Sequence, residues 1–234
     1  MQEAAAMESL DRAQREAVLC GARYILVAAP PGSGKTRVLA SRLARLIDEG
    51  VPVSSIAALT FTEKAAMEMS ARVSAATKRE MKAASIGTFH ALALRILKKI
   101  NPSLRVIGRT GRLDALGALG LTGRKAEKAA ARISFIKNRG PEMASPEGDF
   151  QEIHERYERY LRQNKALDLD DLITEGARVL EENGPGTAPF THVMVDEYQD
   201  INAPQARLLH ALLKSGGHVF AIGDPDQAIY SFRG

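Results

Sequence analysis

Short apolar runs alternate with longer stretches of helical periodicity along most of this chain. Five runs have the length and nearly continuous apolar character of parallel strands buried on both faces. They are Tyr24–Ala28, Ile56–Thr60, Ser85–Thr88, His192–Asp196 and His218–Ile222. Six helical patterns accompany them, at Asp11–Leu19, Lys35–Glu49, Glu63–Thr77, Phe89–Lys99, Asp168–Glu182 and Pro204–Lys214. The alternation predicts an α/β fold in which helices flank a parallel sheet.

The alternation of strands and helices stops between residues 101 and 165. This stretch has a helical pattern with breaks at Gly120–Gly123 and Gly140–Gly148. We therefore predict a discontinuous sheet domain, formed by residues 1–100 and 166–234, that carries a small helical subdomain inserted at residues 101–165.

Composition and charge narrow the class of protein further. The formal net charge of the 234 residues is only +4, but nine basic and two acidic residues lie between Leu104 and Gly140. Such a cluster suits a polyanionic partner, although a solvated helical face would carry the same charges. The single cysteine, Cys20, fits a reducing compartment. Since no apolar run approaches the roughly 20 residues of a membrane span, we expect a cytoplasmic protein without a membrane segment.

Residues 29–36 read Ala-Pro-Pro-Gly-Ser-Gly-Lys-Thr between a predicted strand and a predicted helix. The pattern is typical of a phosphate-binding loop, in which glycines let successive backbone N–H groups face one anion at the positive end of the helix. The lysine would reach the β- and γ-phosphates, and the threonine would ligate Mg²⁺. A glycine-rich turn that only links strand to helix is the alternative. The predicted nucleotide contacts are Gly32, Ser33, Gly34, Lys35 and Thr36, the last also a metal ligand.

A second candidate segment follows the predicted strand that begins at His192. It reads Val-Met-Val-Asp-Glu-Tyr-Gln-Asp at residues 193–200 and delivers two adjacent carboxylates. In a nucleotide hydrolase, Asp196 would bind Mg²⁺ and Glu197 would face the water that attacks the γ-phosphate. Alternatively, both are ordinary solvated residues at a strand end.

A third strand ends in a polar loop near the end of the sequence. Gln227 offers both a donor and an acceptor, which suits contact with the γ-phosphate and the attacking water. Tyr230, Phe232 and Arg233 follow closely and would form a stacking platform for single-stranded bases. Burial of these aromatic side chains in a core is the competing interpretation.

Taken together, six segments resemble, in order, the motifs of the UvrD/Rep/PcrA helicases of superfamily 1. They are Leu10–Gln14, Ala29–Thr36, Leu59–Ala66, Gly87–His90, Val195–Asp200 and Gly223–Tyr230. The resemblance covers nearly the whole chain except the basic insertion. It implies a RecA-like P-loop NTPase fold that uses ATP and Mg²⁺ and binds single-stranded DNA.

The resemblance also assigns roles to residues that the patterns alone do not. It implies that Gln14 pairs with adenine, that Arg37 adds a nucleotide contact, and that two segments contact single-stranded DNA. The implied DNA contacts are Thr60, Phe61, Thr62, Thr88 and His90, with Phe89 beside them. For the threonines and phenylalanines, a structural role at the strand ends competes with DNA contact. The acidic segment Leu167–Leu172 either matches a family segment or simply begins a helix.

The overall function that the resemblance implies is the N-terminal motor domain of an ATP-dependent DNA helicase that moves 3′ to 5′. A second RecA-like domain with arginine fingers is expected outside these 234 residues, so we expect this part alone to bind ATP and hydrolyse it weakly. A stand-alone, nucleotide-gated nucleic-acid-binding module is the alternative. Glu63 and Phe232 depart from the family's usual asparagine and tryptophan.

Overall fold

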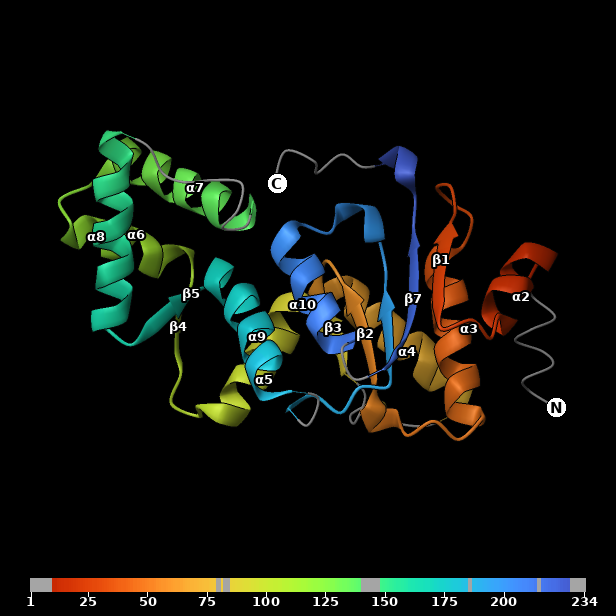
Figure 1. The fold of residues 1–234 in the computed structure, drawn as a ribbon. Coiled ribbons are helices and arrows are strands. Elements are labelled where there is room, and N and C mark those ends of the chain that lie inside the picture. The colour runs from red at the N-terminus through yellow and green to blue at the C-terminus, as the bar shows by residue number, and fades with distance from the viewer. Residues whose placement is uncertain are drawn as a thin grey trace.

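A five-stranded sheet forms the centre of the computed structural model, which describes residues 10–78, 81, 85–139, 148–184, 187–213 and 216–227. The strand order is β1-β7-β6-β2-β3, and every neighbouring pair is parallel (Figure 1). The strands are β1 (Tyr24–Ala28), β2 (Ile56–Thr60), β3 (Ser85–Thr88), β6 (His192–Val195) and β7 (His218–Gly223). Parallel pairing places all five carboxyl ends at one edge, where ligands of such sheets bind.

Helices cover both faces of the sheet. One layer consists of α2 (Arg12–Leu19), α3 (Lys35–Asp48) and α4 (Glu63–Thr77), and the other of α5 (Phe89–Ile100), α9 (Leu169–Asn183) and α10 (Ala203–Leu213). Because successive strand side chains point to opposite faces, Met194 packs with the first layer while Val193 and Val195 pack with the second. The predicted α/β class and its strands and helices are confirmed, with boundaries that shift by one residue at most.

Side-chain caps fix where several of these helices begin. Asp11 and Gln14 form a capping box at α2, and Asp168 and Asp171 form another at α9. Thr62 caps α4 by accepting a hydrogen bond from the backbone N–H of Ala65. Each cap satisfies a backbone donor that the first helical turn leaves unpaired, and α4 and α9 begin within three residues of the strands β2 and β5 that precede them.

The inserted segment forms a cluster of helices at one end of the sheet (Figure 1). It contains α6 (Arg109–Ala118), α7 (Gly123–Arg139) and α8 (Asp149–Gln163), which share a separate apolar core around Leu116, Ile133 and Tyr157. The helical character of the segment is as predicted. Two strands, β4 (Arg105–Ile107) and β5 (Ala166–Asp168), pair in parallel where the chain enters and leaves it. Neither was predicted, because three residues are too few to show a period.

The first strand departs from the predicted burial on both faces. Ile25 and Val27 pack against the α2, α3 and α4 layer, whereas Tyr24 and Leu26 are 60% and 69% exposed. The reason is position, since β1 pairs only with β7 among the described strands and lies at the edge of the sheet. Within the described ranges, no helix has the length and apolar character needed to cross a bilayer.

Candidate functional site

The predicted phosphate-binding loop connects β1 to α3 at the carboxyl edge of the sheet. Gly32 and Gly34 have φ angles of +72° and +81°, in the left-handed region that favours glycine. Gly34 is the N-cap residue of α3, and the backbone N–H groups of Arg37 and Val38 both donate to its carbonyl. The helix dipole and the free N–H groups of the first turn therefore lie beside the loop, as anion binding requires.

Lys35 and Thr36 open α3 directly after this loop. The Lys35 side chain is 9% exposed, which is uncommon for a lysine that is not paired with an anion. Thr36 is half-buried, and Arg37 is exposed on the first turn of α3. The helix thus holds the predicted phosphate ligand inside the protein and leaves Arg37 facing outward.

Gln14 reaches the phosphate loop from α2. Its Nε2 donates to the backbone carbonyl of Ser33 at 2.7 Å, and its Oε1 accepts from the backbone N–H of Asp11 at 3.1 Å. A side-chain amide has two N–H donors and two acceptor lone pairs, so one donor and one lone pair remain for a base edge. The contact with Ser33 joins the predicted adenine-binding residue to the phosphate loop.

The predicted acidic pair lies at the carboxyl end of β6, two strands from β1. Asp196 is 4% exposed, and its Oδ1 accepts a hydrogen bond from the backbone N–H of Glu197 at 3.1 Å. Burial, reinforced by the charge of Glu197, raises the pKa of Asp196 to about 6. Glu197 has a φ of +50°, an uncommon backbone conformation for a residue with a side chain, and it lies partly exposed.

The loop and the acidic pair meet although 162 positions separate them in the sequence. The Lys35 Nζ lies 3.8 Å from the Glu197 Oε2. Two buried polar atoms here, the Ser33 Oγ and the Asp224 Oδ2, have no hydrogen-bond partner among the described residues. Buried polar atoms normally find partners, so the unpaired oxygens, together with the raised pKa of Asp196, fit a bound phosphate and a hydrated Mg²⁺.

Gln227 closes the 3-10 helix η5 (Pro225–Gln227), which follows β7. Its backbone N–H donates to the carbonyl of Asp224 at 3.0 Å, and its side chain is half-buried. The predicted γ-phosphate sensor is thus tied to the strand next to β1. The predicted stacking residues Tyr230, Phe232 and Arg233 lie outside the described residues.

The segments predicted to contact DNA lie at the carboxyl ends of β2 and β3. The hydroxyls of Thr62 and Thr88 accept from the N–H groups of Ala65 and Ala91 and so cap α4 and α5. Thr60 is 1% exposed, and its hydroxyl donates to the Thr62 carbonyl. All three threonines therefore have structural roles, and the capping hydroxyls of Thr62 and Thr88 keep their own O–H as a donor.

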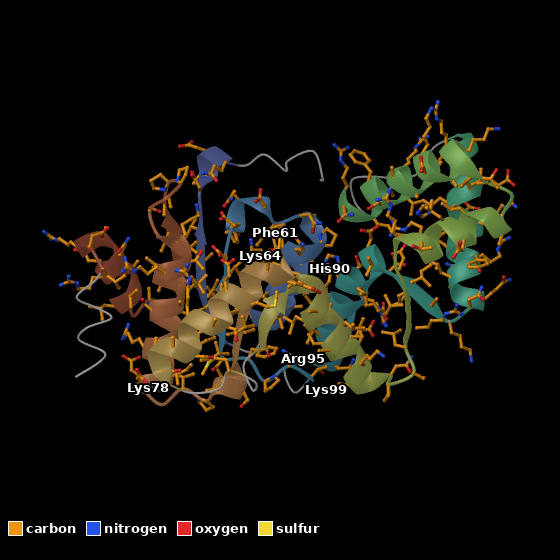
Figure 2. All side chains as sticks on the ribbon, turned by 180° about the vertical axis from the view of Figure 1, so that it is seen from behind. Phe61, Lys64, Lys78, His90, Arg95 and Lys99 are labelled. Carbon is orange, nitrogen blue, oxygen red and sulfur yellow. The ribbon has the colours of Figure 1, made fainter. Side chains whose placement is uncertain are left out.

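Among the aromatic candidates, Phe89 is a core residue that is 1% exposed, whereas Phe61 is half-buried. Burial lowers the pKa of His90, although the charge of Asp170 acts in the opposite direction. Figure 2 shows Phe61, Lys64 and His90 near one another at the beginnings of α4 and α5, with Lys78 and Lys99 toward the other ends of these helices. Phe61 and His90 are therefore half-buried candidates on this edge.

The acidic segment Leu167–Leu172 begins α9 and also binds two of the basic residues of the insertion. Asp168 is fully buried and accepts from Tyr157 at 2.9 Å, from Lys137 at 3.0 Å and from Arg112 at 3.1 Å. Burial alone would raise the pKa of Asp168, but the two cations outweigh it and hold that pKa below its usual value. Lys137 and Arg112 are thus neutralised inside the protein. Neither of them contributes its charge to the polyanion-binding surface predicted for the basic cluster.

Two residues of the candidate site were given no role from the sequence. Gln199 lies within the motif Val195–Asp200 and Asp224 within Gly223–Tyr230, but neither was assigned a role, and Gln199 is hydrogen-bonded to both Glu197 and Asp224. Asp224 follows β7 directly and is 3% exposed, and its position at a strand end beside the phosphate loop was the available signal. Gln199 gave no such signal, because its role depends on a contact with β7 that the sequence does not show.

Sequence comparison shows which known proteins this chain is similar to. The family model of the UvrD/REP helicase N-terminal domain matches residues 10–114 and 118–234. The ATP-dependent DNA helicase PcrA of Staphylococcus epidermidis is 35% identical over 256 residues, which cover 98% of this chain and 35% of that protein. The ATP-dependent DNA helicase UvrD1 of Mycobacterium tuberculosis is 34% identical over 97% of this chain and 34% of its own length. The chain spans about a third of the curated relatives it matches.

Proposed function

The chain belongs to the UvrD/REP helicase family, and we propose that it is the ATP-binding motor part of an ATP-dependent DNA helicase that moves along single-stranded DNA. The approach of Lys35 to Glu197, at 3.8 Å, carries the proposal. It brings a phosphate-binding cation and a carboxylate suited to a general base to one point at the sheet edge. Phosphoryl transfer to water requires these two parts.

Each residue of the site then has a specific task. The backbone of Gly32–Gly34 and the ammonium group of Lys35 hold the β- and γ-phosphates. Glu197 orients the attacking water and accepts its proton, and Gln227 contacts the γ-phosphate. Mg²⁺, held by Thr36 and Asp196, would neutralise charge on the phosphate oxygens. Gln14, fixed to the loop through Ser33, contacts the adenine edge and favours ATP over other nucleotides.

The proposed DNA path crosses the beginnings of α4 and α5 at the same sheet edge. Two helix N-termini there point toward the surface and favour a phosphate backbone. Phe61 supplies a half-buried ring for base stacking, and the Thr62 and Thr88 hydroxyls are free to donate to phosphate oxygens. Because β2 lies beside β6, DNA bound here would be close to the acidic pair.

Two finer points of the proposal rest on the family resemblance. We propose 3′-to-5′ movement, and we propose weak ATP hydrolysis by these 234 residues alone. The reason for the second is that an arginine finger from a second RecA-like domain commonly raises the rate by roughly 10³–10⁵-fold. Opening and closing of two domains is also what drives movement along a strand.

Steady-state hydrolysis of Mg·ATP, with and without single-stranded DNA, tests the proposal. We expect slow turnover that DNA stimulates and that Glu197→Gln abolishes. Lys78→Ala serves as a control, because Lys78 lies at the far end of α4. DNA binding that depends on ATP without any turnover would instead support a nucleotide-gated binding module. Turnover that survives Glu197→Gln would refute the role of this carboxylate.

A further inference from the structure

We propose that Gln199 is a positioning residue that holds the Glu197 carboxylate in place for water activation. This inference rests on the proposed ATP hydrolysis and adds a residue to its machinery. Gln199 lies in the 3-10 helix η4 (Tyr198–Asp200), directly after the acidic pair. It is half-buried and lies between the ends of β6 and β7.

The two ends of the Gln199 amide contact two different motifs. Its Nε2 donates to the Glu197 Oε2 at 2.9 Å, and its Oε1 accepts from the backbone N–H of Asp224 at 2.9 Å. A neutral amide can donate to a carboxylate through its nitrogen and accept from an N–H group through its oxygen at the same time. A carboxylate at this position would still accept from Asp224 but would repel Glu197.

The main chain of β7 is shaped to admit this side chain. A Cβ atom built on Gly223 would lie 2.4 Å from the Gln199 Oε1 and 3.0 Å from the backbone nitrogen of Tyr198. Any side chain at residue 223 would therefore push the amide away from the strand end. The carbonyl of Gly223 also accepts from the N–H of Ala29 at 2.9 Å, so the same residue joins the amide contact to the phosphate loop.

The geometry explains why Glu197 needs such a partner. Its backbone is in the left-handed region, with a φ of +50°, and its carboxylate is also within 3.8 Å of the Lys35 Nζ. A phosphate bound in the loop would compete for Lys35, since both anions attract one ammonium group. The hydrogen bond that Gln199 donates does not depend on Lys35, so it would still hold the Glu197 carboxylate in place when a phosphate is bound. The carboxylate then stays beside η5, where the backbone N–H of Gln227 donates to the carbonyl of Asp224.

Binding of a transition-state mimic tests the positioning role without requiring turnover. The affinities of Mg·ADP and of Mg·ADP with aluminium fluoride are measured for the parent chain, Gln199→Glu and Gln199→Ala. We expect the Kd of both variants for Mg·ADP to lie within about threefold of the Kd of the parent chain. We expect both to bind the aluminium fluoride complex at least roughly tenfold more weakly, with the larger loss in Gln199→Glu.

Gly223→Ala provides a second, independent variant. It moves the same amide without changing the chemistry of Glu197 or Gln199, so it should reproduce the selective loss, and its combination with Gln199→Ala should add little. The inference is overturned if Gln199→Glu binds the aluminium fluoride complex as well as the parent does while Glu197→Gln does not. A parent chain that does not bind Mg·ADP would refute the proposed function itself, and the positioning role with it.

Discussion

Asn202 donates a hydrogen bond from its side-chain amide to the side-chain carbonyl of Asn138, with 2.6 Å between the two atoms. Asn138 belongs to α7 of the inserted helices, and its own amide donates to Asp170 at 3.0 Å. Asn202 follows η4, the turn that carries Gln199. A direct chain of polar contacts therefore connects the insertion to the loop after the acidic pair.

Replacing Asn138 by alanine tests how much these contacts contribute to the free energy of unfolding. The change removes the acceptor for Asn202 and the donor for Asp170, so we expect the free energy of unfolding to fall by about 1–3 kcal/mol. Urea unfolding followed by circular dichroism measures it. Asn164→Ala is the matched control, because Asn164 is exposed and donates only locally, to the carbonyl of Tyr160. An equal decrease in the free energy of unfolding in the two variants would show that the contact between Asn138 and Asn202 stabilises the fold no more than a local surface hydrogen bond does.

The pH dependence of stability reports on the ion-pair cluster at the start of α9. Burial raises the pKa of Asp171 to about 7, although Lys137 lies 2.7 Å from its Oδ1 and acts in the opposite direction. Because the folded state then holds a proton that the unfolded state releases above about pH 4, this group stabilises the fold at low pH. Its contribution is lost as the pH rises toward about 7, by up to about 1.4 kcal/mol per unit.

Asp171→Asn isolates that contribution. Unfolding free energies of the parent and the variant are compared between pH 4.5 and 8 at constant ionic strength. We expect the parent to lose more stability than the variant as the pH rises, because the amide does not titrate. Parallel stability curves for the two proteins would mean that Asp171 is ionised throughout and that Lys137 dominates its environment.

The proposed DNA path predicts unequal effects for two lysines of the same helix. Lys64 is exposed in the first turn of α4 beside Phe61, whereas Lys78 is exposed at the other end of the helix (Figure 2). Lys64→Ala should weaken binding of oligo-dT several-fold. It should also reduce the slope of the logarithm of the binding constant against the logarithm of the salt concentration by roughly 0.7. Lys78→Ala should leave both unchanged. Similar losses in both variants would indicate binding over the whole helix face instead.

The sequence was sufficient for the strands and helices of the main sheet and for the helical character of residues 101–165. Strand Ile56–Thr60 is buried at every position and apolar from Ile56 to Leu59, so the apolar run located β2 and the helical pattern after it located α4. The glycines of residues 29–36 likewise predicted a tight loop between strand and helix, and Gly32 and Gly34 have positive φ angles there. These signals are local, and local signals survive without tertiary context.

Features that depend on distant partners were not predictable. The exposure of Tyr24 and Leu26 follows from the edge position of β1, which the order of strands in the sheet decides. Lys137 looked like part of a surface charge cluster, yet it is buried against Asp168 and Asp171. Gln199 acquires its role only because Gly223 lies opposite it. The proposed roles of individual residues in the nucleotide site remain predictions.

Equilibrium titration with a fluorescent ATP analogue and Mg²⁺ tests the central claim most directly, in the parent chain and in Lys35→Ala. The buried lysine beside Glu197 is proposed to hold the terminal phosphates, and a lost charge-assisted contact commonly costs about 1.5–3 kcal/mol. We therefore predict saturable binding by the parent and binding at least roughly tenfold weaker by the variant. Equal affinities in the two proteins would contradict the claim that this loop is the nucleotide site.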